Sequence, residues 1–170
     1  MDEQGVSAQS ASMKPINLHL AASLAIASAT ALVTPAMAQD DDWLNQPQTP
    51  GDWEYVAESR ETLALFGQSN EAVHLFVMRC DMDSRRIGIA RRGTTERELV
   101  MRIRTETQER VLTANQVPKN RLIAAEVDAF DPLLDAMALS RGRFAIEVEG
   151  LEPLYIPAWA EVTRVIEDCR

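Results

Sequence analysis

The chain has 170 residues, of which 46 % are hydrophobic and 25 % charged, and its formal net charge is −9. This length suits a single domain, and this balance is typical of a packed globular protein rather than a disordered one. The acidic excess argues against nonspecific nucleic-acid binding, because phosphate contacts need positive charge. After residue 38, Lys119 is the only lysine and every other cation is an arginine. Genome composition is the simpler explanation for this preference for arginine. The alternative is that arginine was selected because its forked guanidinium group recognises anions.

Residues 13–38 have the pattern of a secretory export signal. A lysine follows Met13, an apolar, alanine-rich run comes next, and Ala-Met-Ala ending at Ala38 supplies a small–x–small cleavage site. The run is short for a membrane-spanning helix, so we expect cleavage after Ala38, a periplasmic location and no membrane span afterwards. A retained membrane anchor is the alternative. Residues 1–12 place two acids ahead of the signal, and we expect them to be a start-site extension, with translation beginning at Met13.

The remaining chain is predicted to form a flexible lead-in over residues 39–52 and a single globular domain over 53–170. The lead-in is polar and contains two prolines and a glycine. In the domain, short segments rich in apolar residues, several of them with alternating polarity, predict strands separated by turns. The predicted strands cover residues 53–58, 62–66, 71–80, 85–91, 98–105, 110–114, 121–129, 143–148 and 154–156.

Two short helices complete the pattern. Asp131 can cap the first, Pro132 suits its first turn, and Gly142 lies just past its end. The second covers residues 158–169. Its 3, 4, 3 spacing predicts one face packed on the sheet, made of Trp159, Val162, Ile166 and Cys169.

The only cysteines, Cys80 and Cys169, are predicted to form a disulfide. An isolated pair in an oxidising compartment is most simply a structural bond. A reactive thiol pair is the alternative, but there is no Cys-x-x-Cys spacing, and the acidic neighbours would raise a thiol pKa. The fold class that we predict is therefore α+β, mainly antiparallel β as a sandwich or curled sheet, with two short helices. The disulfide ties the C-terminal helix to a central strand.

Residues with catalytic or metal-binding patterns are scarce. After signal cleavage His74 is the only histidine, and its apolar strand favours a structural role over a catalytic one. No nucleophile motif, phosphate-binding loop or metal-ligand cluster is present, so we predict no catalytic residues, no metal and no cofactor. Carboxylate pairs are candidates by residue type alone, and capping or solvation explains them more simply. These pairs are Asp131 with Asp135 and Glu161 with Asp168.

Arginines concentrate in residues 79–104, where they form either a positive patch for an anionic ligand or acidic partner, or internal salt bridges. We favour internal pairing, with Glu126, Asp128, Glu147 and Glu149 as the acids. A second candidate site is Arg141 and Arg143, which can bind an anion or cap the last helical carbonyls, and we favour the cap. The full candidate patch is Arg85, Arg86, Arg102, Arg104, Arg141 and Arg143.

The chain resembles small periplasmic proteins of proteobacteria. The residues that carry the resemblance are Asp52-Trp53 at the domain start, Arg79-Cys80 closing an apolar strand, and the terminal Glu167-Asp168-Cys169-Arg170. It is distantly similar to the invasion-associated locus B family and to VasI-like accessory proteins of type VI secretion, although it has only two cysteines. Residues 131–144 also resemble uncharacterised alphaproteobacterial envelope proteins. The resemblance implies an exported, β-rich, non-catalytic domain.

The function we expect is therefore a non-enzymatic periplasmic accessory or binding protein of the cell envelope. Its partner would be an envelope protein or an anionic ligand, not nucleic acid. One alternative is a small hydrolase that acts on envelope carbohydrate through two carboxylates, which requires a cleft. Another is an inhibitor of a periplasmic enzyme, which requires an exposed apolar patch.

Overall fold

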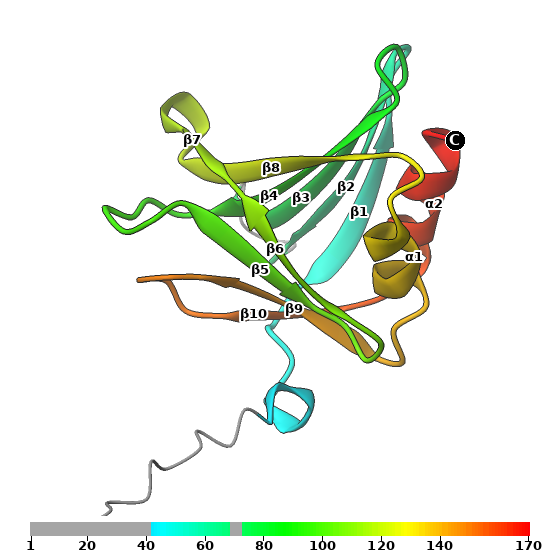
Figure 1. Cartoon of the computed structure of the whole chain (residues 1–170). Helices are drawn as coiled ribbons and strands as arrows, with labels where there is room; N and C mark the ends of the chain where they lie inside the picture. The colour runs from blue at the N-terminus through cyan, green and yellow to red at the C-terminus, as the bar shows by residue number, and fades with distance from the viewer. Residues whose placement is uncertain (1–41, 69–72) are drawn as a thin grey trace, which may run out of the picture. The chain divides into compact units, whose positions relative to one another are not determined.

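A computed structural model describes residues 42–68 and 73–170 of the chain. The start-site extension (1–12) and the export signal (13–38) lie outside the described residues, and so do the first two residues of the strand predicted over 71–80. The described part is α+β, built mainly from antiparallel strands with two α-helices, which confirms the predicted fold class (Figure 1).

Six strands form the larger sheet, sheet A, in the order β1-β2-β3-β4-β8-β7. Neighbouring strands are antiparallel throughout. Their side chains alternate between a buried inner face and an outer face, as the period-2 pattern requires. Strand β7 is short and was not predicted from the sequence. The bounds are β1 Asp52–Ala57, β2 Glu61–Gly67, β3 His74–Asp81, β4 Arg86–Arg92, β7 Asn115–Val117 and β8 Leu122–Asp128.

Four strands form the smaller sheet, sheet B, in the order β10-β9-β5-β6, and all of its neighbouring pairs are antiparallel. Their bounds are β5 Val100–Arg104, β6 Glu109–Thr113, β9 Arg143–Val148 and β10 Leu154–Pro157. At one edge, β6 runs into β7 of sheet A with only Ala114 between them. At the other edge, the Trp53 indole N–H donates to the Pro157 carbonyl at 2.9 Å. The two sheets therefore meet at both edges.

The core lies between the inner faces of the two sheets. Phe76 of β3 and Phe144 of β9 meet edge to face, with ring centroids 5.9 Å apart, and Trp53 packs on Phe76 in the same way at 6.0 Å. Aromatic rings in this arrangement stabilise beyond the area that they bury. The apolar side chains that alternate along the strands therefore pack together between the sheets and hold them against each other.

Two helices, α1 (Pro132–Ala138) and α2 (Ala160–Asp168), lie at one end of the sandwich (Figure 1). Helix α2 packs on β1, β2 and β3, and α1 packs on α2. The Asp131 carboxylate caps α1 by accepting from the Leu133 N–H at 2.9 Å, as predicted. Cys80 in the interior strand β3 and Cys169 after α2 form a disulfide with Cα atoms 5.5 Å apart, which confirms the predicted link.

The structure shows two anchors in the described part of the lead-in, although most of residues 42–51 are exposed. Trp43, in the short 3-10 helix η1 (Trp43–Asn45), is only 7 % exposed. The Arg104 guanidinium lies 5.8 Å from the Trp43 ring. The backbone N–H of Thr49 donates to the Tyr155 carbonyl at 2.9 Å. The polar composition of this segment gave no indication that Trp43 would be buried.

Candidate functional site

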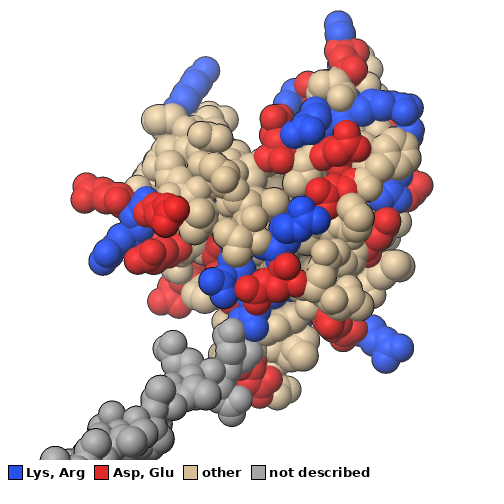
Figure 2. Space-filling view, in the orientation of Figure 1, with Lys and Arg blue, Asp and Glu red and all other residues tan. Residues whose placement is uncertain are grey.

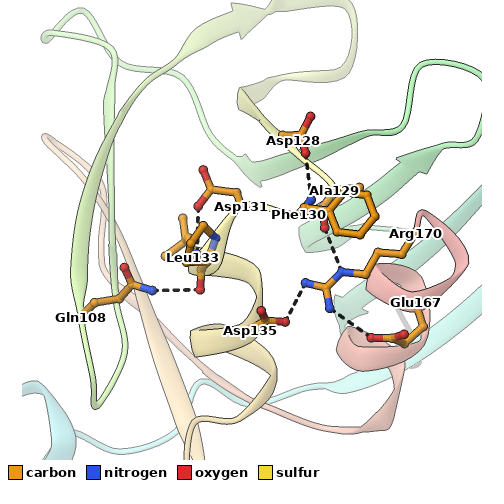
Figure 3. Close-up of polar contacts among 10 residues, drawn as sticks. Gln108, Asp128, Ala129, Phe130, Asp131, Leu133, Asp135, Glu167 and Arg170 are labelled. Atoms are coloured by element: carbon orange, nitrogen blue, oxygen red, sulfur yellow. Dashed lines mark hydrogen bonds and ion pairs between the residues drawn. The ribbon is translucent and has the colours of Figure 1, made fainter.

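The first candidate carboxylate pair, Asp131 and Asp135, is engaged in structural contacts (Figure 3). Asp131 caps α1 and also pairs with Arg110 at 3.1 Å. Asp135 pairs with Arg170 at 2.6 Å, and the same guanidinium donates to the Ala129 carbonyl at 3.0 Å. Arg170 also pairs with Glu167 at 3.3 Å, so this one residue joins α1, α2 and the end of β8. The acids here hold the helices in place.

The second pair, Glu161 and Asp168, lies on α2, seven positions apart, with about 10 Å of helix rise between the two residues. Asp168 accepts a hydrogen bond from the Tyr55 hydroxyl at 2.6 Å. Desolvation and this hydrogen bond raise the pKa of Tyr55. Asp168 therefore ties α2 to β1.

On sheet B, Arg102 and Arg104 are paired with acids rather than free for a ligand. Arg102 lies 3.2 Å from Glu109 and 3.8 Å from Glu147, and Arg104 lies 3.2 Å and 3.4 Å from the same two carboxylates. The register puts Arg102 opposite Glu147 and Arg104 opposite Glu109. These four charges therefore form a closed network on the outer face of sheet B. Of the acids expected to pair internally, Glu147 does so here and Glu149 pairs with Arg97 at 3.8 Å, whereas Glu109 was not among those expected.

Arg85 and Arg86 lie elsewhere, at the turn between β3 and β4. Arg85 takes the left-handed conformation, with φ 52°. Arg86 opens β4, and its register neighbours are Asp81 on β3 and Asp128 on β8. Acidic strand neighbours thus flank Arg86. The arginines that are close in sequence are separated by the sheet topology and form no single patch.

Arg141 and Arg143 follow α1, but they do not cap it. The Ser140 hydroxyl donates to the Ala136 carbonyl at 2.8 Å, and the Leu139 N–H donates to the Asp135 carbonyl at 2.9 Å. Arg143 instead donates to the Gln46 carbonyl, and Arg141 is exposed. The predicted cap is therefore wrong, because a serine and the helix's own backbone already satisfy these carbonyls.

Two large apolar side chains are exposed at the ends of the helices. Leu139 is 80 % exposed after α1, and Trp159 is 45 % exposed before α2. The Ala158 N–H donates to the Gly142 carbonyl at 3.3 Å, so the backbone segments that carry Arg141 and Trp159 are joined. We call Leu139, Arg141 and Trp159 the helix-end patch.

The sequence pattern misplaced Trp159. The structure starts α2 at Ala160 and leaves Trp159 extended as its N-cap, with φ −91° and ψ 177°. Its side chain therefore does not follow the helical face, and Val165 contributes the further buried residue on that face. Only the exact start of α2 would have shown that Trp159 lies outside the helix. The ends of helices are the part that sequence patterns place least accurately.

A groove of about 660 Å³ lies on the outer face of sheet A. Its floor is made of small side chains from three strands, and residues of β6, β7 and the 3-10 turn η2 (Pro118–Asn120) line one side. Figure 2 shows the surface hollowed above β8, between the lobe of β7 and η2 and the charged turns at the ends of β1–β2 and β3–β4. The floor residues on the outer face are Val77, Gly88, Ala90 and Ala124.

His74 is half-buried at the start of β3, in a smaller cavity of about 260 Å³ that Asp52 and Glu54 also line. No hydrogen bond joins its side chain to another of the described residues, and its structural rather than catalytic role stays a prediction. No group of three metal-ligating side chains occurs in residues 42–68 and 73–170. In the same part of the chain, no helix has the length and apolar content to cross a membrane.

No family model, curated protein or solved structure matches the chain. The candidate surfaces therefore rest on their own geometry.

Proposed function

We propose that this protein is an exported, non-catalytic accessory or binding protein of the cell envelope that uses the helix-end patch to hold a partner protein. The secretory pattern of residues 13–38, with cleavage after Ala38, supports a periplasmic location. The buried disulfide is compatible with an oxidising compartment. Three of the four carboxylates that the rival hydrolase would use already make structural contacts.

The exposure of Trp159 carries the proposal. The other two tryptophans, Trp43 and Trp53, are buried, whereas Trp159 presents nearly half of its surface. The backbone bond between Ala158 and Gly142 joins the segment that carries Trp159 to the segment that carries Leu139 and Arg141. Tryptophan and arginine are the residues that most often dominate the energy of protein interfaces. The partner would need an apolar side chain to cover Trp159 and a carboxylate to pair with Arg141.

The test compares partner capture by the native protein and by Trp159→Ser/Arg141→Glu. Serine is a favoured N-cap, so the substitution removes the indole without removing the start of α2. Val111→Ser is the matched control, because Val111 is 52 % exposed on the outer face of sheet B. Tagged proteins are crosslinked mildly in envelopes of the native host, and the captured proteins are identified by mass spectrometry.

We expect one reproducible partner with the native protein and with Val111→Ser, and its loss with the double variant. Capture that is equal with the double variant would overturn the helix-end patch as the binding surface. Turnover of an envelope saccharide by the purified protein would overturn the non-catalytic assignment.

The same patch also favours a second candidate, inhibition of a periplasmic enzyme, because an inhibitor needs an exposed apolar surface rather than a cleft. If the captured partner is an enzyme, its activity with the native protein and with the double variant distinguishes the two functions. Inhibition that the double variant loses would identify an inhibitor. Unchanged activity would identify an accessory protein.

A further inference from the structure

The outer face of sheet A differs from the outer face of sheet B. Sheet B carries the network of Arg102, Arg104, Glu109 and Glu147. In sheet A, the register aligns apolar and small residues from strand to strand, with Leu65 opposite Val77, Val77 opposite Ala90, and Ala90 opposite Ala124. Both helices lie at the end of the sandwich and leave the groove open (Figure 1). An apolar face on an antiparallel sheet normally meets another surface.

Gly88, in the middle of this face, has no reason within its own chain to be glycine. A Cβ atom added there would meet its nearest neighbour, the Arg79 carbonyl oxygen, at 3.8 Å, which is ordinary contact. Its φ is not in the positive range that favours glycine. Glycine inside a strand weakens it and often marks a place where another backbone approaches closely. The missing side chain leaves room for another surface to approach this face.

The charges beside Gly88 are arranged symmetrically. Arg79 on β3 is its register neighbour on one side, and Glu126 on β8 is its neighbour on the other. Strands are spaced about 4.8 Å apart, so the opposite charges stand at similar distances from Gly88. Arg79 pairs with Glu61 in its own chain, while Glu126 has no ion-pair partner among the described residues.

We infer that a second copy of this chain binds here, face to face, about a two-fold axis that runs along β4. This rotation exchanges the two sides of β4, so it places Arg79 of each copy opposite Glu126 of the other. It also sets Gly88 of one copy opposite Gly88 of the other, and Ala90 opposite Ala90, so the residues on the axis at the middle of the face are small. Two-fold dimers require such a self-complementary surface.

The same axis matches the apolar edges of the face. On one side of β4 lie β3 and then β2, and on the other side lie β8 and then β7. The outermost strand β1, beyond β2, has no counterpart on the other side. Strand β2, with half-buried Leu63 and Leu65, therefore lies against β7 of the other copy, which presents Val117. None of these residues belongs to the helix-end patch, so the dimer leaves that patch open for a partner.

Charge exchange tests the axis. Arg79→Glu alone sets a carboxylate of one copy against a carboxylate of the other, and Glu126→Arg alone sets guanidinium against guanidinium, so each variant repels its own copies. A mixture of the two variants restores an attractive pair of opposite charges. The chain expressed from its complete reading frame is studied by sedimentation velocity from roughly 1 µM to 1 mM, which covers weak and moderate dimers.

We expect the native protein to dimerise, each single variant to raise the dimer dissociation constant at least about tenfold, and the mixture to recover the native constant. Gly88→Val supplies a second variant that favours the strand but blocks close approach, and it should be folded and monomeric. A native protein that stays monomeric throughout would overturn the inference. So would a dimer that Gly88→Val leaves intact, or a mixture that associates no better than its components.

Discussion

At the residue scale, Arg91 shows how a charge is held inside the domain. It alternates with Ile87 and Ile89 on the inner face of β4 and is only 5 % exposed. Its guanidinium donates to the carbonyl of Glu152 at 2.8 Å and to that of Arg92 at 3.2 Å. Burial lowers the pKa of Arg91 to about 10, so the side chain remains charged at neutral pH. This charge ties β4 to the turn between β9 and β10.

Thr62 gives a residue-scale prediction, because its buried hydroxyl has no hydrogen-bond partner within the described residues. Thr62→Val keeps the shape and removes the unsatisfied polar atom, so it should raise the free energy of unfolding by about 1 kcal/mol. Urea unfolding measures the change. Thr113→Val, at an exposed position of β6, is the control and should change little. A loss of stability in Thr62→Val would mean that the hydroxyl bonds to the neighbouring Tyr55, whose pKa it influences.

At the element scale, the disulfide holds α2 on sheet A. It closes a sequence separation of 89 residues, and both sulfur-bearing side chains are buried. Helix α2 also contacts the sheet through the Tyr55–Asp168 hydrogen bond and through Val162, Val165 and Ile166. The covalent bond therefore reinforces an interface that is already packed.

Cys80→Ala/Cys169→Ala should lower the free energy of unfolding by about 4 kcal/mol, because the unfolded chain regains the entropy of a long closed loop. Chemical unfolding of the double variant measures the loss, and the native protein under reducing conditions should lose a similar amount. A loss below about 1 kcal/mol would show that packing alone sets the stability of this interface.

At the scale of the whole molecule, the proposed function depends on export, which leads to a further prediction. The chain expressed from its complete reading frame in a bacterial host should appear in the periplasm with an intact mass that begins at Gln39. Ala38→Arg should block cleavage, since the site requires a small residue there. A different mature N-terminus, or an uncleaved native protein, would contradict the export signal.

The strands and helices of this protein were largely predictable because their patterns are local. Alternation around Ile87 and Ile89 predicted β4, and the Asp131-Pro132 pair predicted the start of α1. Strand β7 was not predicted because its three residues are too few to show an alternation of polar and apolar side chains. The candidate surfaces were less predictable: Arg141 was named from the sequence, but Trp159 was assigned to the core.

The sequence by itself determined the fold class, most of the elements and the pairing of Cys80 with Cys169, because hydrophobic period and cysteine number need no knowledge of distant neighbours. Only the tertiary structure decided which arginines are paired. It aligned Arg102 with Glu147 and separated both from Arg86 and Arg141. It also decided that Trp159 is exposed and that Arg79 and Glu126 flank Gly88. Each of these outcomes depends on the register between strands far apart in the chain, which the long-range packing of the core sets.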